Sequence, residues 1–146
     1  MRRAGFSLTE MLIVVVIIGL AGMIALPRLN AAFDRSSVGS AKSRLTALYG
    51  AARAVATSAN QTAGLRLNGN QVYVYASPRH KAGAGTIDTI VRPADFSTAY
   101  GVTLSGGFDS VRVASTGLGL DSAVIVLTKG YSADTVIINR FGRVLK

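Results

Sequence analysis

Residues 6–27, FSLTEMLIVVVIIGLAGMIALP, decide how this chain folds. No charged side chain occurs between Met11 and Leu26, and 12 of the 21 residues from Phe6 to Leu26 are Phe, Leu, Ile or Val. As a helix rising about 1.5 Å per residue, these residues would measure roughly 31 Å, close to the hydrocarbon thickness of a bilayer. Their side chains favour membrane insertion by roughly 4 to 7 kcal/mol. The stretch is therefore predicted to span a membrane.

The composition limits what the rest of the chain can be. Its 146 residues allow one small domain and an appendage, and 49% hydrophobic against 16% charged residues argues against a disordered protein. Lys and Arg number 16 against 7 Asp and Glu, a net charge of +9, which is compatible with an anionic partner. The chain has no cysteine. A disulfide framework, a zinc ribbon and thiol catalysis are therefore excluded.

A secretory signal peptide is the simplest alternative for the apolar stretch. Arg2 and Arg3 form a basic n-region before it. However, the apolar run is longer than a usual h-region, and its far end, residues 21–27, contains no A-x-A cleavage site. A membrane anchor fits the stretch better.

Glu10 is the only glutamate of the chain, and it lies inside the apolar stretch. It could extend to the membrane interface, or it could pair with a cation, since ionisable groups in membranes are costly and usually paired. No basic side chain lies between Arg3 and Arg28. A cut between Gly5 and Phe6 would create the missing cation, because the new amine would lie one helical turn from Glu10. The amine of a neighbouring subunit could then meet the carboxylate.

Residues 1–27 resemble the class III signal of type IV pilins and type II secretion pseudopilins. The shared features are a short basic leader ending in Gly5, a following Phe6, an acid at the fifth position after the cut, and Pro27 near the end of the run. The resemblance implies cleavage by prepilin peptidase after Gly5 and N-methylation of Phe6. It also implies assembly with other pilins or pseudopilins through the N-terminal helices, with Glu10 in the intersubunit charge pair. On filament formation, helical order is expected to be lost between Gly19 and Pro27.

The helical pattern resumes after Pro27 and becomes amphipathic over residues 28–62. One long helix is therefore predicted to continue from the membrane into the head, with Pro27 bending or loosening it, and to lay its apolar stripe on one face of a sheet. The apolar residues recur at steps of three and four, at Val38, Ala41, Leu45, Leu48, Ala52, Val55 and Ala59.

From about Leu65 the period changes to two, which is typical of strands. Asn68-Gly69-Asn70 marks a hairpin turn between two of them. We expect no second helix, and Ser77–Gly85 is predicted to be the most mobile loop. The predicted strands are Leu65–Leu67, Gln71–Tyr75, Ile87–Arg92, Val102–Leu104, Phe108–Val113, Ala123–Thr128 and Thr135–Asn139.

The predicted fold class is α+β, and the resemblance makes it a pilin-like fold: a long N-terminal helix packed on an antiparallel β-sheet head. The expected organisation is a leader at 1–5, a transmembrane and assembly helix at 6–27, an amphipathic helix at 28–62 and a β-rich head at 63–146. AARAVA at 51–56 and IINRFGR at 137–143 are similar to heads of the GspH/FimT type. That group includes a minor pseudopilin of type II secretion and a minor pilin linked to DNA uptake.

The residues offer little for catalysis. One His, no Cys, one Glu and six scattered Asp leave no cluster in sequence, and neither G-x-S-x-G nor H-E-x-x-H occurs. His80 lies between Arg79 and Lys81, which suits a solvated loop residue. We expect no enzyme, cofactor or metal site, and a membrane-tethered hydrolase is the third alternative. The resemblance instead implies a structural subunit in the inner membrane, with its head in the periplasm, that enters a pseudopilus or pilus.

The alternative function, DNA binding, depends on the basic residues of the C-terminal tail. Arg140, Arg143 and Lys146 could bind DNA phosphates, as in the DNA-uptake branch, whose tail reads Gly-Arg-x-Arg or Gly-Arg-x-Lys. Here GRVLK at 142–146 is longer by one residue, and in a strand Arg143 and Lys146 would point to opposite faces. A solvated basic face that keeps the protein soluble is the simpler interpretation.

Overall fold

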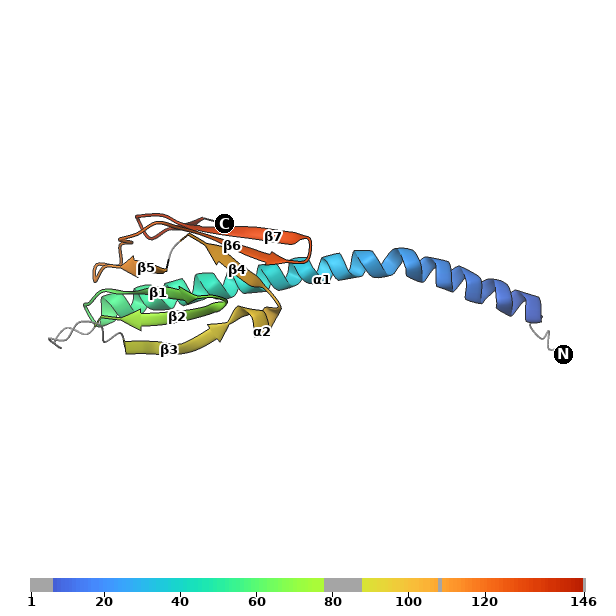
Figure 1. The fold of residues 1–146 in the computed structure, drawn as a ribbon, viewed down its shortest axis with the longest axis horizontal. Coiled ribbons are helices and arrows are strands. Elements are labelled where there is room, and N and C mark those ends of the chain that lie inside the picture. Colours follow the sequence, from blue (N-terminus) through green and yellow to red (C-terminus); the bar gives the residue numbers. More distant parts are fainter. Residues whose placement is uncertain (1–6, 78–87, 108, 146) are drawn as a thin grey trace, which may run out of the picture. The chain divides into compact units, whose positions relative to one another are not determined.

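The structure is a computed structural model, and it describes residues 7–77, 88–107 and 109–145. Contacts divide the chain into two compact units, Met1–Phe33 and Asp34–Lys146, which we describe separately. The first consists of the beginning of helix α1 (Leu8–Ser58), and the second holds the rest of α1 and all the strands. Figure 1 shows the elements along the chain.

Helix α1 is continuous through Pro27, so the single long helix expected from the sequence is confirmed. Within the second unit it buries Leu45 and Ala52 completely, in agreement with the predicted stripe. Ala59 is exposed because the helix ends at Ser58, and Asn60 follows with a left-handed φ of 48°. The buried residues of α1 are Val38, Ala41, Leu45, Leu48, Tyr49, Ala52 and Ala56.

The strands form two antiparallel sheets, so the expected single sheet is wrong, although the α+β class with a long helix packed on antiparallel strands is confirmed. One core joins α1 to both sheets. The first sheet has the order β3-β2-β1-β5 and the second the order β4-β6-β7-β8. The strands are β1 (Ala63–Asn68), β2 (Gln71–Ala76), β3 (Asp88–Asp95), β4 (Thr103–Gly106), β5 (Ser110–Val113), β6 (Ala123–Lys129), β7 (Ser132–Ile138) and β8 (Val144–Leu145).

The first sheet is built around the predicted hairpin. Asn68 pairs with Gln71 across the turn, and Gly69 takes a φ of 58°, as the Asn-Gly turn predicts. Leu65 and Val74 form a cross-strand pair, and both are fully buried.

A short helix separates the two sheets and corrects the expectation of no second helix. Helix α2 (Phe96–Tyr100) begins where Asp95 accepts hydrogen bonds from Ser97 N and Thr98 N, at 2.9 and 3.2 Å. It ends at Gly101, whose φ is 64°. Asp95 is a good N-cap and Gly101 a good C′ residue, so this single turn forms despite its weak helical period. After α2, the next strand, β4, does not join the sheet of β3. It pairs with β6 in the second sheet.

The predicted ends of several strands need adjustment. β3 extends three residues beyond Arg92, and β8 is an additional two-residue strand that pairs with β7. Residues 78–85 of the predicted mobile loop, His80 among them, lie outside the described residues, as do Ile87 and Phe108.

Polar contacts fasten the hairpin of β6 and β7 to the helical part of the second unit. Lys42 Nζ lies 2.7 Å from both carboxylate oxygens of Asp134. Lys129 Nζ donates to Ser37 Oγ at 2.9 Å and lies 4.0 Å from Asp34 Oδ1. The hydrogen bond from Lys42 holds the pKa of the Asp134 carboxyl below its usual range.

Candidate functional site

The first turn of α1 is closed by a reciprocal pair of hydrogen bonds between Ser7 and Glu10. Glu10 N donates to Ser7 Oγ at 3.2 Å, and Ser7 N donates to Glu10 Oε2 at 3.3 Å. This capping box satisfies two of the backbone donors that a helix leaves unpaired at its N-terminus. Its sequence signal is Ser-x-x-Glu before an apolar run, whereas the expectations above treat Glu10 only as a membrane charge.

The capping box places the only glutamate at the positive end of the helix dipole. Glu10 is exposed, and a carboxylate in the first helical turn is favourable. It remains available to a cation from outside the helix, because a carboxylate has about four acceptor sites and Ser7 N occupies one. Gly5 and Phe6 lie outside the described residues, so cleavage and N-methylation stay predictions.

The helix surface that follows is apolar on every side. Each Leu, Ile, Val, Met and Phe from Leu8 to Phe33 is between 47 and 80% exposed. The helix is long and apolar enough to cross a membrane by its length and composition. A helix that is hydrophobic all round requires a membrane or a large surrounding core. The apolar helix therefore fits a membrane anchor.

The C-terminal tail forms a tight turn that presents two cations. Asn139 Oδ1 accepts hydrogen bonds from Phe141 N and Arg143 N at 3.1 and 2.8 Å, and Gly142 has a φ of 72°. Arg140 and Arg143 are both exposed. Arg143 precedes β8, so it is not part of a strand, while Lys146 lies outside the described residues.

The same turn borders an apolar groove of about 530 Å³. Phe141 is 71% exposed at this groove, and Val124 and Ile137 are 49 and 41% exposed. The tail thus combines cations with an exposed aromatic ring. The lining residues are 122–124 and 137–141.

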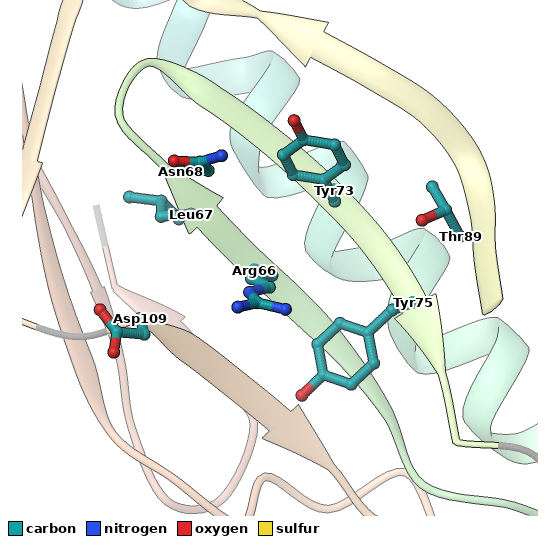
Figure 2. A pocket seen from close by; sticks show the side chains of 7 residues that line it. All are labelled: Arg66, Leu67, Asn68, Tyr73, Tyr75, Thr89 and Asp109. Atoms are coloured by element: carbon teal, nitrogen blue, oxygen red, sulfur yellow. The ribbon is translucent and has the colours of Figure 1, made fainter. Parts of the chain in front are cut away.

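A second pocket lies on the first sheet and has a polar lining (Figure 2). We call it the tyrosine pocket; its volume is about 630 Å³. Sequence reasoning missed it, although the alternation of Tyr73 and Tyr75 with buried valines marks one face of β2. Its lining residues are Arg66, Leu67, Asn68, Tyr73, Tyr75, Thr89 and Asp109.

Metal-binding geometry is lacking in the part of the chain that the structure describes. There, no three His, Cys, Asp or Glu side chains come close enough together to hold a metal ion. The acids of the head are used in other ways: the bidentate Arg112 guanidinium, for example, holds the pKa of the Asp121 carboxyl below its usual range.

Comparison with known proteins supports both the N-terminal motif and the fold. Residues 1–26 match a family described as the prokaryotic N-terminal methylation motif. The fold matches a crystal structure of the type IV minor pilin FimU from Pseudomonas aeruginosa strain PAO1, with a TM-score of 0.59 and 17% identity over 76% of this chain and 88% of FimU. The chain carries a pilin-type N-terminal motif and has a pilin-like fold.

A second crystal form of FimU gives this pilin-like chain a TM-score of 0.55 at 16% identity, over 73% of the chain and 90% of FimU. No curated protein matches the chain at a significant level. Pilin-type proteins assemble with other pilins and require processing by prepilin peptidase. This chain shares their fold.

Proposed function

We propose that the chain is a minor structural subunit of a type II secretion pseudopilus. In this proposal prepilin peptidase cuts after Gly5, and Phe6 is N-methylated. Before assembly, the subunit is anchored in the inner membrane with its head in the periplasm. It then enters the filament through its N-terminal helix and supports protein secretion. The observation that carries the proposal is the exposed apolar helix with a single carboxylate in its first turn.

The physical argument concerns what covers the helix. Its apolar side chains, exposed from Leu8 to Phe33, are covered first by lipid and then by the equivalent helices of neighbouring subunits. Between apolar helices packing is not selective, so a charge pair fixes the register. Glu10 supplies the anion, and the amine of Phe6 from the adjoining subunit supplies the cation. Such a pair is favourable because an unpaired charge in the membrane is costly.

The tail favours the pseudopilus over a DNA-uptake pilus. Its basic residues are spaced one position further apart than in the DNA-uptake branch. Asn139 also holds the backbone of Arg143 in a tight turn, which limits how far this cation can move toward an extended phosphate track.

Deletion and complementation test the proposed system. We expect deletion of the gene to abolish export of type II secretion substrates, and the wild-type chain to restore it, while natural transformation stays unchanged. Intact mass of the complementing protein should show loss of residues 1–5 and a gain of about 14 Da from the methyl group. Normal secretion in the deletion strain, or a mature chain that retains residue 1, would contradict the proposal.

DNA binding during uptake is the second candidate function, and the exposed Arg140 and Arg143 favour it. Gel-shift titration of the full chain at two salt concentrations tests it, with Arg140, Arg143 and Lys146 changed to Gln. DNA binding at the tail predicts that this variant loses affinity and that its salt slope falls by about one per phosphate contact removed. A matched variant with the exposed Arg35, Arg44 and Arg92 changed to Gln removes the same three charges and controls for net charge. Binding that is absent, or equal in both variants, removes this candidate.

A further inference from the structure

We propose that the tyrosine pocket binds a neutral oligosaccharide. The pocket lies on the outer face of the first sheet, within the head, and the proposal does not depend on which filament the chain enters. Its volume of about 630 Å³ is within the range of small-molecule sites. Figure 2 shows Tyr73 on β2, the Tyr75 ring reaching from β2 over β1, and Asp109 on the far side of β1, with Arg66 on β1 between Tyr73 and Asp109.

Strand register brings these side chains to one face. Arg66 of β1 lies directly opposite Tyr73 of β2, and Gly64 lies opposite Tyr75. Because successive side chains of a strand alternate between faces, the buried Leu65 turns into the core while its neighbour Arg66 turns outward. The core pattern of the two strands thus fixes the pocket on the opposite face.

Gly64 allows the Tyr75 ring to lie against the strand. A Cβ at residue 64 would be 3.0 Å from Tyr75 Oη and 3.1 Å from its Cζ, and it would also clash with the Val111 carbonyl oxygen. The ring therefore occupies the space that a side chain would take. Tyr75 is only 8% exposed, so it forms a fixed wall of the pocket.

Tyr73 is held by a second contact. Its hydroxyl donates to Gln71 Oε1 at 2.6 Å, which fixes the ring on the outer face of β2. Rigid aromatic rings bind at a low entropic cost, and their electron-rich faces attract the weakly positive C–H groups of a sugar ring. The partly exposed Tyr73 ring provides the surface for this contact, and the nearly buried Tyr75 ring borders it.

The polar groups of the pocket both donate and accept hydrogen bonds. Arg66 has five N–H donors and Asp109 has only acceptors, while Asn68 and Thr89 supply both kinds. No ion pair joins Arg66 to Asp109 among the described residues. Asp109 is also positioned by its backbone, whose carbonyl accepts from Leu67 N at 2.9 Å. Neighbouring sugar hydroxyls, which donate and accept, match this set.

The charge of the pocket favours a neutral ligand over a nucleic acid. Its lining holds one cation, Arg66, and one anion, Asp109. Two further cations lie outside this lining: Arg112 is engaged by Asp121 through bonds of 2.8 and 3.0 Å, and Arg92 of β3 is exposed. A phosphate backbone would therefore meet the Asp109 carboxylate without a second free guanidinium in the lining. Nucleic-acid sites instead gather several cations along the strand.

Saturation-transfer NMR on the full chain, solubilised in a detergent without a sugar headgroup, tests the proposal. The probes are maltotriose, cellotriose and chitotriose, each at about 5 mM, a concentration that fills most of a site with a Kd of about 1 mM. We expect saturation transfer to at least one probe. Arg66→Ala and Tyr73→Ala should each weaken binding about tenfold or more, because each removes a direct contact.

Two matched variants control for general effects of these substitutions. Arg44→Ala removes an exposed arginine of α1, and Tyr131→Ala removes a fully exposed tyrosine at the turn between β6 and β7. Both should bind the probe as the wild type does. Asp109→Asn, which keeps the shape of the side chain, should weaken binding several-fold and covers the case in which an alanine variant fails to fold.

Three results would overturn the proposal. The first is no saturation transfer to any of the three probes, and the second is equal binding by the pocket variants and their controls. In the third, an oligothymidylate of about 12 nucleotides binds through Arg66 more tightly than any of the saccharides, which would make the pocket a single-strand nucleic-acid site.

Discussion

The two units of this chain use apolar residues in opposite ways. From Leu8 to Phe33 every large apolar side chain is exposed, whereas in the head Leu45, Ile125 and Ile138 are completely buried. The first segment carries its apolar residues on all sides of a helix, and the second carries them on one stripe or one strand face. A one-sided pattern can be buried by the same chain, but an all-round pattern needs lipid or other subunits. The comparison separates residues that serve assembly from residues that serve folding.

Glu10→Ala should give the largest effect, and it should act on assembly while the head stays intact. Loss of one partner of a desolvated charge pair costs about 2 to 5 kcal/mol, so filament incorporation should fall more than about tenfold. The head should stay folded, because Glu10 belongs to the other unit. The measurement is the fraction of subunit in sheared filaments. Ser7→Ala, which removes the cap but keeps the charge, is the matched control; normal filament entry by the Glu10 variant would refute the pairing.

Leu45→Ala should affect the other unit, because it should destabilise the folded head. Removal of a fully buried Leu costs about 2 to 5 kcal/mol, from lost burial and the cavity left behind. Leu20→Ala makes the same chemical change where the side chain is 59% exposed, and the head should keep its stability within about 0.5 kcal/mol. Urea unfolding of the full chain in micelles, followed by tyrosine near-UV circular dichroism, measures both. Equal midpoints for the two variants would contradict the division into units.

Two glycine substitutions, one in each unit, test the same difference between the head and the exposed helix. Gly64→Ala should destabilise the head by about 1 to 3 kcal/mol, because the new methyl group meets the Val111 carbonyl and the Tyr75 ring. Gly19→Ala meets no atom within 4 Å and should favour the helix by about 1 kcal/mol. The same unfolding assay, with helical circular dichroism for the second variant, tests them. A Gly64→Ala head as stable as the wild type would show that the ring can move aside.

The smallest effect concerns pH. Because the folded state lowers the pKa of Asp134, the Lys42 pair stabilises the head above the unfolded pKa of about 3.8, and this contribution disappears as pH falls through the folded pKa. Asp134 is 42% exposed, so the pair contributes at most about 1 kcal/mol.

Asp134→Asn should therefore lower stability at pH 7 and flatten the loss of stability as pH falls below about 4. Urea midpoints across this range measure the slope. Lys42→Met is the matched variant, because it removes the same pair from the other side. A slope that neither variant changes would exclude the pair as its source.

The sequence predicted the parts of this fold that follow a single period. The α1 stripe and the Asn68-Gly69 hairpin agree with the structure because local spacing determines them. The division into two sheets was not predictable, since it depends on a one-turn helix held by Asp95 and Gly101 rather than on a hydrophobic period.

The candidate sites show the same limit. Glu10 was recognisable as an isolated charge in an apolar run, and the Ser-x-x-Glu spacing was readable too. The tyrosine pocket needs residues from β1, β2, β3 and the segment before β5. Tyr73 and Arg66 become neighbours only through strand register, which the sequence does not specify on its own.

The polar contacts of Lys42 and Lys129 between α1 and the β6–β7 hairpin have a mechanical consequence. Asp34, Ser37 and Lys42 lie along α1, and each contacts the β6–β7 hairpin. A tensile load along the helix axis would reach the hairpin through all of these side-chain contacts at once. The contacts would therefore have to break together and not one after another. Such an arrangement slows forced unfolding, which is governed by the unfolding rate and not by equilibrium stability.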